Sequence, residues 1–308
     1  MKVDRGDPSG WDRDAGPSAL TIGVFDGVHL GHRHVLSLLA AEASERGLGT
    51  AVMTFDPHPL TVVAPDAAPR LLTTVDQRLE LLAAMGVDRT AVLPFSDRVR
   101  SLSPAAFVTE ILRDALDARI VAVGEDFRFG RDRTGNVEFL REMGEGVGFE
   151  TIVVSLVGDD SPVSSTRIRR LVADGDVAAA TVLLGRHHEV RGEVVRGDGR
   201  GASIGVPTAN LDLPDGVAVP ARGVYAVRVG VDDEEHPGVA NIGVRPTFGG
   251  EEETLEVHLL SGGRDLYGSG LAVRFVDRIR DERRFDGIEA LVAQIGSDIG
   301  EARRILDA

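Results

Sequence analysis

The chain has 308 residues, of which 43% are hydrophobic and 27% charged, a composition typical of a soluble globular protein with room for one large or two ordinary domains. It has no apolar run of about 18 residues, no apolar leader and no cysteine, which excludes a membrane span, a signal peptide, disulfides and thiolate metal sites. The net charge of −15 at pH 7 disfavours nucleic acid as the main partner, and we expect a cytoplasmic protein.

The first 185 residues alternate between strand-like and helix-like segments. Apolar runs predict strands at 19–25, 49–55, 89–95, 118–124 and 149–156. Amphipathic patterns predict helices at 34–47, 74–86, 103–116, 136–146 and 165–185. Thr74 opens a capping box, and Ser103 with Pro104 marks another helix start. This alternation predicts a Rossmann-like, doubly wound parallel sheet with helices on both faces, to which the N-terminal 16 residues add at most a short edge strand.

The pattern changes near Gly185 to short alternating runs separated by glycine, proline and aspartate. These runs predict strands at 188–197, 223–230, 237–244, 254–260 and 271–280, followed by a terminal helix at 287–306. Closely spaced short strands are typical of a small antiparallel β-barrel. We therefore expect two domains, 1–185 and 186–308, joined without a low-complexity linker.

A glycine-bounded turn follows the first predicted strand, where doubly wound sheets bind their ligands. It reads Gly-Val-Phe-Asp-Gly from Gly23 and continues into His-Leu-Gly-His. Glycines permit tight turns and close approach to a phosphate. The turn supplies candidate phosphate-binding residues, namely Gly23, Phe25, Asp26 and Gly31.

His29 and His32 lie three positions apart, which puts both rings on one side if a helical turn begins there. Two imidazole N–H donors near a helix N-terminus suit a phosphate whose charge grows during transfer. Two alternatives stay open: half of a metal site, for which Asp26 is the only nearby third ligand, and a solvated first turn. His34 is expected to be a surface residue.

The chain has no Walker A loop, because that loop ends in Gly-Lys-Ser/Thr and Lys2 is the only lysine. A G-x-G-x-x-G fingerprint is absent too. A second hydroxyl- and arginine-rich segment, Val-Ser-Ser-Thr-Arg-Ile-Arg from Val163, could bind phosphates without lysine. Its candidate residues are Ser164, Ser165, Thr166 and Arg169. Together with the His-x-Gly-His step, this segment resembles the nucleotidyltransferase superfamily, which transfers adenylyl groups from ATP.

Two further motifs end the second and fourth predicted strands, at the same edge of the sheet. They are Thr-Phe-Asp-Pro-His-Pro, with Asp56 and His58, and Gly-Glu-Asp-Phe-Arg-Phe-Gly, with Asp126, Phe127 and Phe129. The two phenylalanines could pack in the hydrophobic core. Their position in a glycine-bounded loop favours instead an exposed pair on which the flat ring of a ligand stacks. The motif pair resembles the FMN adenylyltransferase module of bacterial bifunctional FAD synthetases.

A glycine-rich loop opens the β region and ends in Pro-Thr-Ala-Asn. Such a loop can form a phosphate nest, although a plain turn cluster is the alternative. Hydroxyl and amide oxygens suit Mg²⁺. The candidate ATP-binding residues are Gly199, Gly201, Gly205, Pro207, Thr208 and Asn210, with Thr208 and Asn210 also as Mg²⁺ ligands. Glu256 lies on an alternating strand, and Arg280 and Phe285 precede the last helix as candidate flavin contacts.

This half resembles the riboflavin kinase module, whose hallmark is Gly-x-Pro-Thr-Ala-Asn. The resemblance implies that Thr208 and Asn210 bind Mg-ATP and that Glu256 is the base on the ribityl hydroxyl. Val206 departs from the family, which usually has Phe or Tyr there, and this could alter flavin affinity. Val24 replaces a frequent asparagine, which looks tolerable.

The two resemblances cover the chain in the order of the bifunctional riboflavin kinase/FMN adenylyltransferase family. They imply that riboflavin and ATP give FMN, and that FMN and ATP then give FAD and pyrophosphate, with Mg²⁺ as cofactor. The partners expected are the small molecules ATP, riboflavin and FMN, without nucleic acid or a membrane, and the oligomeric state stays open. Three alternatives stay open: a degenerate flavin-binding or sensing protein, a nucleotidyltransferase with one activity, and a fragment of an aminoacyl-tRNA synthetase. The last expects a Lys-Met-Ser-Lys-Ser loop and a basic RNA-binding face, which the chain lacks.

Overall fold

The computed structural model describes residues 1–155, 162–197, 201, 204–232, 234–247, 250–262 and 264–307. Contacts between residues divide the chain into two compact units. The first unit comprises Met1–Pro69 and Thr74–Ser164, and the second comprises Arg70–Thr73 and Ser165–Ala308. Each unit has a hydrophobic core of its own.

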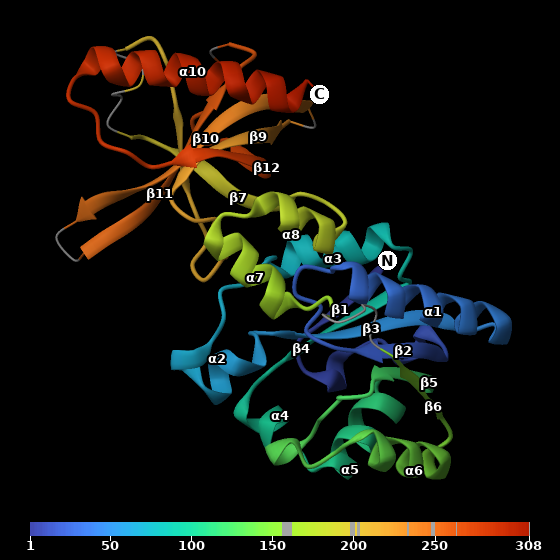
Figure 1. Ribbon diagram of the computed structural model, residues 1–308. Coiled ribbons are helices and arrows are strands. Elements are labelled where there is room, and N and C mark those ends of the chain that lie inside the picture. The colour runs from blue at the N-terminus through green and yellow to red at the C-terminus, as the bar shows by residue number, and fades with distance from the viewer. Residues whose placement is uncertain are drawn as a thin grey trace. The chain divides into compact units, whose positions relative to one another are not determined.

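The first unit contains a six-stranded sheet in the order β1-β4-β3-β2-β5-β6, and every neighbouring pair is parallel, as predicted (Figure 1). Its strands are β1 (Lys2–Arg5), β2 (Ser18–Ile22), β3 (Gly49–Asp56), β4 (Arg89–Pro94), β5 (Ala118–Gly124) and β6 (Glu150–Val154). The strands β3, β2 and β5 are adjacent at the centre of the sheet. The turns that carry the predicted motifs therefore leave the sheet from the same edge.

Helices pack on both faces of this sheet (Figure 1). The helices of the first unit are α1 (Leu30–Arg46), α2 (Pro59–Val63), α3 (Val75–Ala84), α4 (Asp97–Ser101), α5 (Pro104–Ala106), α6 (Val137–Val147), the π-helix η4 (Phe107–Arg113) and the 3₁₀ turns η1 (Pro8–Gly10), η2 (Arg13–Ala15), η3 (Pro65–Ala67) and η5 (Arg131–Arg133). Val52 of β3 packs with residues of α1 and α3. Its neighbours Ala51 and Met53 point to the opposite core, which contains residues of η4 and α6.

Local sequence signals explain most helix boundaries. The capping box at Thr74 forms as predicted, and the Ser103 hydroxyl accepts a hydrogen bond from the amide of Ala106. The segment predicted as one helix at 103–116 continues as a π-helix, in which the Thr109 hydroxyl donates to the carbonyl of Ala105. The helix expected at 34–47 begins earlier, at Leu30, because His29 serves as its N-cap.

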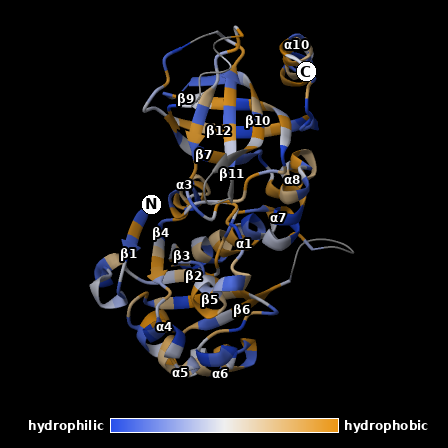
Figure 2. Ribbon diagram, turned by 90° about the vertical axis from the view of Figure 1, so that its left-hand side faces the viewer, coloured by the Kyte–Doolittle hydropathy of each residue, from blue (hydrophilic) through white to orange (hydrophobic). Residues whose placement is uncertain are grey.

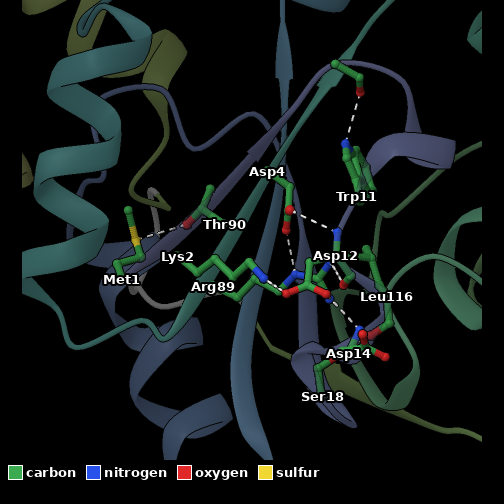
Figure 3. A network of polar contacts seen from close by, with 11 residues as sticks. Met1, Lys2, Asp4, Trp11, Asp12, Asp14, Ser18, Arg89, Thr90 and Leu116 are labelled. Carbon is green, nitrogen blue, oxygen red and sulfur yellow. Dashed lines mark hydrogen bonds and ion pairs between the residues drawn. The ribbon is translucent and has the colours of Figure 1, made fainter.

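The N-terminal segment closes one edge of the sheet through a polar network around Arg89 (Figure 3). The Nε of Arg89 donates to Oδ2 of Asp4 over 2.7 Å, and its Nη2 donates to the carbonyl of Asp12 over 2.8 Å. Asp12 also pairs with Lys2, and the buried Trp11 donates from Nε1 to the carbonyl of Gly6. The short edge strand is thus confirmed as β1, which is held by a buried ion pair.

The second unit is a closed antiparallel barrel with strand order β10-β11-β8-β7-β12-β9, as predicted. Its elements are α7 (Ser165–Asp174), α8 (Val177–Leu184), β7 (His188–Val195), β8 (Ala209–Asp212), β9 (Gly223–Val231), β10 (Glu234–Thr247), β11 (Gly250–Leu259), β12 (Gly270–Asp281) and α10 (Ile288–Leu306). Leu71, in the segment Arg70–Thr73, bridges Val217. Contacts group α7 and α8 with the barrel, whereas the division expected at residue 185 follows the change from helices to strands.

Hydrophobic and hydrophilic residues alternate along the barrel strands (Figure 2). Because successive side chains of a strand point to opposite faces, this alternation separates a buried interior from the outer surface. In β12, Leu271, Val273 and Phe275 are buried, and the residues between them are partly exposed. The strand β8 was missed by the sequence reading, which placed 197–210 in a loop. Ala209 and Leu211 of this short strand point into the barrel core. Within the described residues, no helix has the length and apolar character needed to cross a membrane.

Candidate functional site

The turn between β2 and α1 is tightly folded and mostly buried. Phe25 and Val28 have φ values of 54° and 36°, which are uncommon for residues other than glycine. The amide of Val28 donates to the carbonyl of Phe25 over 3.0 Å, and Gly23 donates to the carbonyl of Met53 on β3. Asp26 is 1% exposed. Positive φ values at bulky residues are typical of functional turns, where the surrounding contacts hold an unfavourable conformation.

The two predicted imidazoles form a stacked pair at the start of α1. The rings of His29 and His32 are 3.7 Å apart and 17° from parallel, and Phe25 packs on His32 at 4.8 Å. The Nδ1 of His29 accepts the amide hydrogen of His32 over 3.4 Å, so a neutral His29 carries its proton on Nε2. Burial, followed by the electrostatic effects of His29 and Arg78, lowers the pKa of His32 well below its ordinary value of 6.5. His32 is therefore neutral near pH 7.

Gly31 separates this pair from the start of the Val-Ser-Ser-Thr segment. A Cβ at Gly31 would lie 3.2 Å from the His29 ring and 3.4 Å from the carbonyl of Val163, so only glycine fits here without displacement. Ser164 follows within the first unit, and Ser165, Thr166 and Arg169 form the first turns of α7 in the second unit. His34 is exposed on α1, as expected.

In the barrel, three predicted residues lie together on and directly before two neighbouring strands. Glu256 of β11 pairs in register with Asn210 of β8. The hydroxyl of Thr208 donates to Oε2 of Glu256 over 3.2 Å. All three side chains are partly exposed, whereas Ala209 and Val257 between them point into the barrel core. This arrangement presents one carboxylate, one hydroxyl and one amide on the outer face of the barrel.

The glycine-rich loop packs closely before β8. A Cβ at Gly201 would lie 2.4 Å from the carbonyl oxygen of Val206. The amide of Val206 donates to the carbonyl of Gly201 over 2.9 Å. Gly205 has a φ of 81°, a conformation that favours glycine. A Cβ at Gly197 would meet the side chain of Asn210 at 2.4 Å. The predicted Gly199 lies outside the described residues.

A cavity of about 290 Å³ opens beside Pro207 and Thr208. His258 fixes its wall by donating from Nδ1 to the carbonyl of Pro207 over 2.8 Å. Apolar side chains such as Val194 and Leu266 line much of the rest, together with the ring of Tyr267 and the charged Arg264 and Asp265. The cavity is large enough for part of a small organic ligand.

The order of these two sites agrees with the families that the chain matches. The FAD synthetase family matches residues 12–167. The riboflavin kinase family matches residues 184–306. The protein named bifunctional riboflavin kinase/FMN adenylyltransferase from Escherichia coli K12 is 43% identical to this chain, and the alignment covers 92% of this chain and 91% of that protein. The protein of that name from Bacillus subtilis is 38% identical, covering 93% and 92%. This chain belongs to the bifunctional riboflavin kinase/FMN adenylyltransferase family.

A solved structure from Streptococcus pneumoniae, titled as a macrolide-efflux protein, is also similar. It is 33% identical, with a TM-score of 0.90 over 98% of this chain and 99% of that chain. A likeness of this extent supports the fold of both units. The family matches explain why one chain holds a nucleotidyltransferase-like sheet and a kinase-like barrel.

The prediction that both Phe127 and Phe129 of the adenylyltransferase unit are exposed is wrong for Phe129. This ring is 6% exposed and packs against Phe107 and Phe139 in the core. Its strand-like bridge to Gly135 turns it inward, and a Cβ at Gly135 would lie 2.9 Å from the ring. Phe127 stacks on Phe129 at 5.4 Å and is only partly buried. Of the two, Phe127 alone offers a face outside the core.

The other residues predicted at this edge occupy the ends of β3 and β5. Asp56 and Asp126 are exposed. His58 caps α2, and its Nδ1 accepts the amide hydrogen of Leu60 over 3.1 Å. These positions agree with the predicted location at the ligand edge of the sheet.

All three nitrogens of the Arg280 guanidinium, in the riboflavin kinase unit, donate hydrogen bonds within the protein. Its Nε and Nη2 donate to the carboxylate of Asp298 on α10, and Nη1 donates to the carbonyl of Asp281. Asp298 also accepts from Gln294. Phe285 lies 5.7 Å from the Arg280 guanidinium. The structure therefore gives Arg280 a role in fastening α10 to β12, which the sequence reading did not foresee.

Arg78 was missed by the sequence reading, although it lies beside the histidine pair. It is 1% exposed on α3 and belongs to no motif. The one available signal was an arginine next to apolar helix positions, which resembles an ordinary surface residue.

Proposed function

We propose that this chain converts riboflavin to FAD in two steps at two separate sites. The barrel phosphorylates riboflavin with ATP to give FMN and ADP. The sheet unit then transfers the adenylyl group of a second ATP to FMN and releases pyrophosphate. Family membership supports both activities, and the observation that carries the first is the contact between Thr208 and Glu256 beside Asn210.

In the kinase step, Glu256 is the general base. Its carboxylate accepts the proton of the terminal ribityl hydroxyl as that oxygen attacks the γ-phosphorus of ATP, and the bond to the β-phosphate oxygen breaks to release ADP. The Thr208 hydroxyl, 3.2 Å from Oε2, orients this carboxylate. The ATP phosphates would lie against the backbone at Gly201 and Gly205.

The residues at this site fit Mg²⁺. Thr208 and Asn210 supply a hydroxyl and an amide oxygen, the hard donors that Mg²⁺ prefers. No group of three or more His, Cys, Asp or Glu side chains suited to a metal occurs in the described part of the chain. This agrees with an ion held by few protein oxygens together with substrate phosphates. When bound, Mg²⁺ neutralises the phosphate charge.

The cavity beside Thr208 suits the adenine of the same ATP. Tyr267 offers a 63% exposed ring at its mouth, and Pro207 and Leu266 offer apolar contact. Thr208 belongs both to the cavity and to the Glu256 contact. A nucleotide whose base occupies the cavity can therefore direct its phosphates toward the kinase residues.

In the adenylyl step, a phosphate oxygen of FMN attacks the α-phosphorus of ATP, and the bond to the pyrophosphate oxygen breaks. Ring N–H groups of His29 and His32 would donate to the α-phosphate oxygens as their negative charge grows. The stacked geometry lets both rings act on one group. Gly23, Phe25, Asp26 and Gly31 shape this pocket. Ser164, Ser165, Thr166 and Arg169 would bind the departing pyrophosphate, and Asp56, His58, Asp126 and Phe127 would line the flavin and nucleotide edge.

We also propose the domain boundaries 1–185 and 186–308 for the two activities. The FAD synthetase match ends at residue 167, and the riboflavin kinase match begins at residue 184. These limits support a boundary within or directly after α7 and α8. Small-molecule substrates are the partners that the two sites require. The net charge of −15 and the absence of cysteine agree with a cytoplasmic enzyme that does not bind nucleic acid.

A product assay tests the proposal. The purified chain is incubated with Mg²⁺, ATP and either riboflavin or FMN, and the flavins are separated by chromatography. We expect riboflavin to give FMN and then FAD, and FMN to give FAD directly. Flavin binding without either product would favour a sensing protein, and FMN without FAD would show that the sheet unit is inactive.

A further inference from the structure

The buried guanidinium of Arg78 joins three segments of the first unit. Its Nη1 donates to Oγ1 of Thr54 over 2.9 Å and to the carbonyl of Phe55 over 3.3 Å, both at the carboxyl end of β3. The Thr54 hydroxyl donates in turn to the carbonyl of Val24 over 2.8 Å, in the turn after β2. A single side chain on α3 thus connects that helix to the two segments that precede Asp26 and Asp56.

Charge adds a second connection. Burial, the largest influence, lowers the pKa of Arg78, whereas the negative charges of Asp26 and Asp56 raise it. Arginine stays protonated in proteins, so Arg78 is a buried cation. A buried cation is unfavourable unless charges and hydrogen bonds compensate it. Here the compensation comes from two carboxylates at the ligand edge, which argues that Arg78 is retained for the site rather than for packing.

Arg78 also acts on the histidine pair. The groups whose charges act on His32 are His29 at the N-cap of α1 and Arg78 on α3, and both lower the pKa of His32. Asp26 in the turn and Asp56 on β3 act on Arg78. The cation therefore favours a neutral His32 while its hydrogen bonds hold the adjoining backbone.

We propose that Arg78 is a positioning residue for FMN adenylylation, whose guanidinium holds the end of β3 and the turn after β2 in one arrangement around the histidine pair. The proposal rests on the adenylyltransferase function proposed for this unit. Arg78 itself need not touch a substrate, because its hydrogen bonds go to Thr54 and Phe55.

The test compares Arg78→Met, which removes the charge at similar length, with Arg78→Lys, which keeps it. Arg89→Met is the matched control, because Arg89 is also a buried, ion-paired arginine of this unit, but it lies on β4 and pairs with Asp4 of the edge strand β1. FAD formation from FMN, FMN formation from riboflavin, the pH profile of FAD formation and thermal unfolding are measured on the full chain. FMN formation is the internal control, since its residues lie in the barrel.

Arg78→Met should lower kcat for FAD formation by about 100-fold, the cost of a small misplacement of reacting groups. It should leave FMN formation within about twofold. Loss of the cation should raise the pKa of His32, so the acid side of the pH profile should move to higher pH. Arg78→Lys should lower kcat by about tenfold, without that movement.

Wild-type FAD formation in both Arg78 variants would overturn the proposal. A loss that Arg89→Met reproduces, with the same change in unfolding temperature, would also overturn it and reveal a structural role. If Arg78→Met does not fold, Arg78→Lys decides, since a selective loss of FAD formation supports the proposal and its absence contradicts it. A wild-type chain that makes FMN but no FAD would instead contradict the proposed function of the sheet unit.

Discussion

The two units build their sites in different ways. In the sheet unit, polar groups lie beneath the surface: Asp26 and Arg78 are each 1% exposed, and His29 is 5% exposed. In the barrel, Asn210 and Glu256 are partly exposed on two strands whose register places them side by side. Thr208, which directly precedes β8, is also partly exposed and donates to Glu256. A site set by backbone register should tolerate changes around it. A site set by buried polar contacts should be sensitive to residues that never touch a substrate.

The largest expected effect is that of Glu256→Gln on FMN formation. Loss of the proposed general base should lower kcat by about 10²–10⁴-fold, whereas FAD formation from supplied FMN should be unchanged. Glu253→Gln on the same strand is the control, because Glu253 pairs with Arg70 at an exposed position. Rates of both steps, measured by chromatography, check this. Equal losses in both steps would contradict the separation of the sites.

The double variant His29→Ala/His32→Ala should lose FAD formation next most strongly, by about 10²–10³-fold, because both proposed donors to the α-phosphate are removed. FMN formation should continue at the wild-type rate. His34→Ala, an exposed residue of the same helix, is the matched control. Retained FAD formation in the double variant would show that the imidazoles do not stabilise the transferring phosphate.

A smaller, structural effect is expected at α10. Asp298→Ala leaves Arg280 without its carboxylate partner in a mostly buried position, which should lower the free energy of unfolding of the barrel by about 3–5 kcal/mol. Urea unfolding followed by circular dichroism and by residual FMN formation measures this. Glu301→Ala, which breaks an exposed pair with Arg304, should leave the midpoint unchanged. An unchanged midpoint in Asp298→Ala would mean that Arg280 finds another partner, such as the flavin.

Much of the fold could be predicted from the sequence, because buried parallel strands and alternating barrel strands have distinct periodicities. The strand β8 was not predicted, because it follows a glycine-rich loop and its four residues, Ala209–Asp212, are too few to show alternation. The helix α1 was expected too late, since a histidine N-cap is not among the usual start signals.

The positions of Thr208 and Asn210 after the glycine-rich loop could be predicted, because both residues lie within its motif. The burial of Phe129 and of Arg78 could not be predicted, because the environment of each side chain is formed by segments that are distant in sequence. Phe129 turns inward onto η4 and α6, and Arg78 turns inward onto β3. Nothing in the residues next to either one indicates burial. The ion pair of Arg280 could not be predicted for the same reason, because its partner Asp298 lies on the last helix.

The most direct test of the central claim, that two separate sets of residues carry the two reactions, is a complementation assay. Glu256→Gln and His29→Ala/His32→Ala are each incubated with riboflavin, ATP and Mg²⁺, alone and as an equal mixture. The account predicts almost no product from the first, FMN alone from the second, and FAD from the mixture, since FMN released by one chain serves the other. A mixture that makes no FAD, or FAD from the second variant alone, would contradict it.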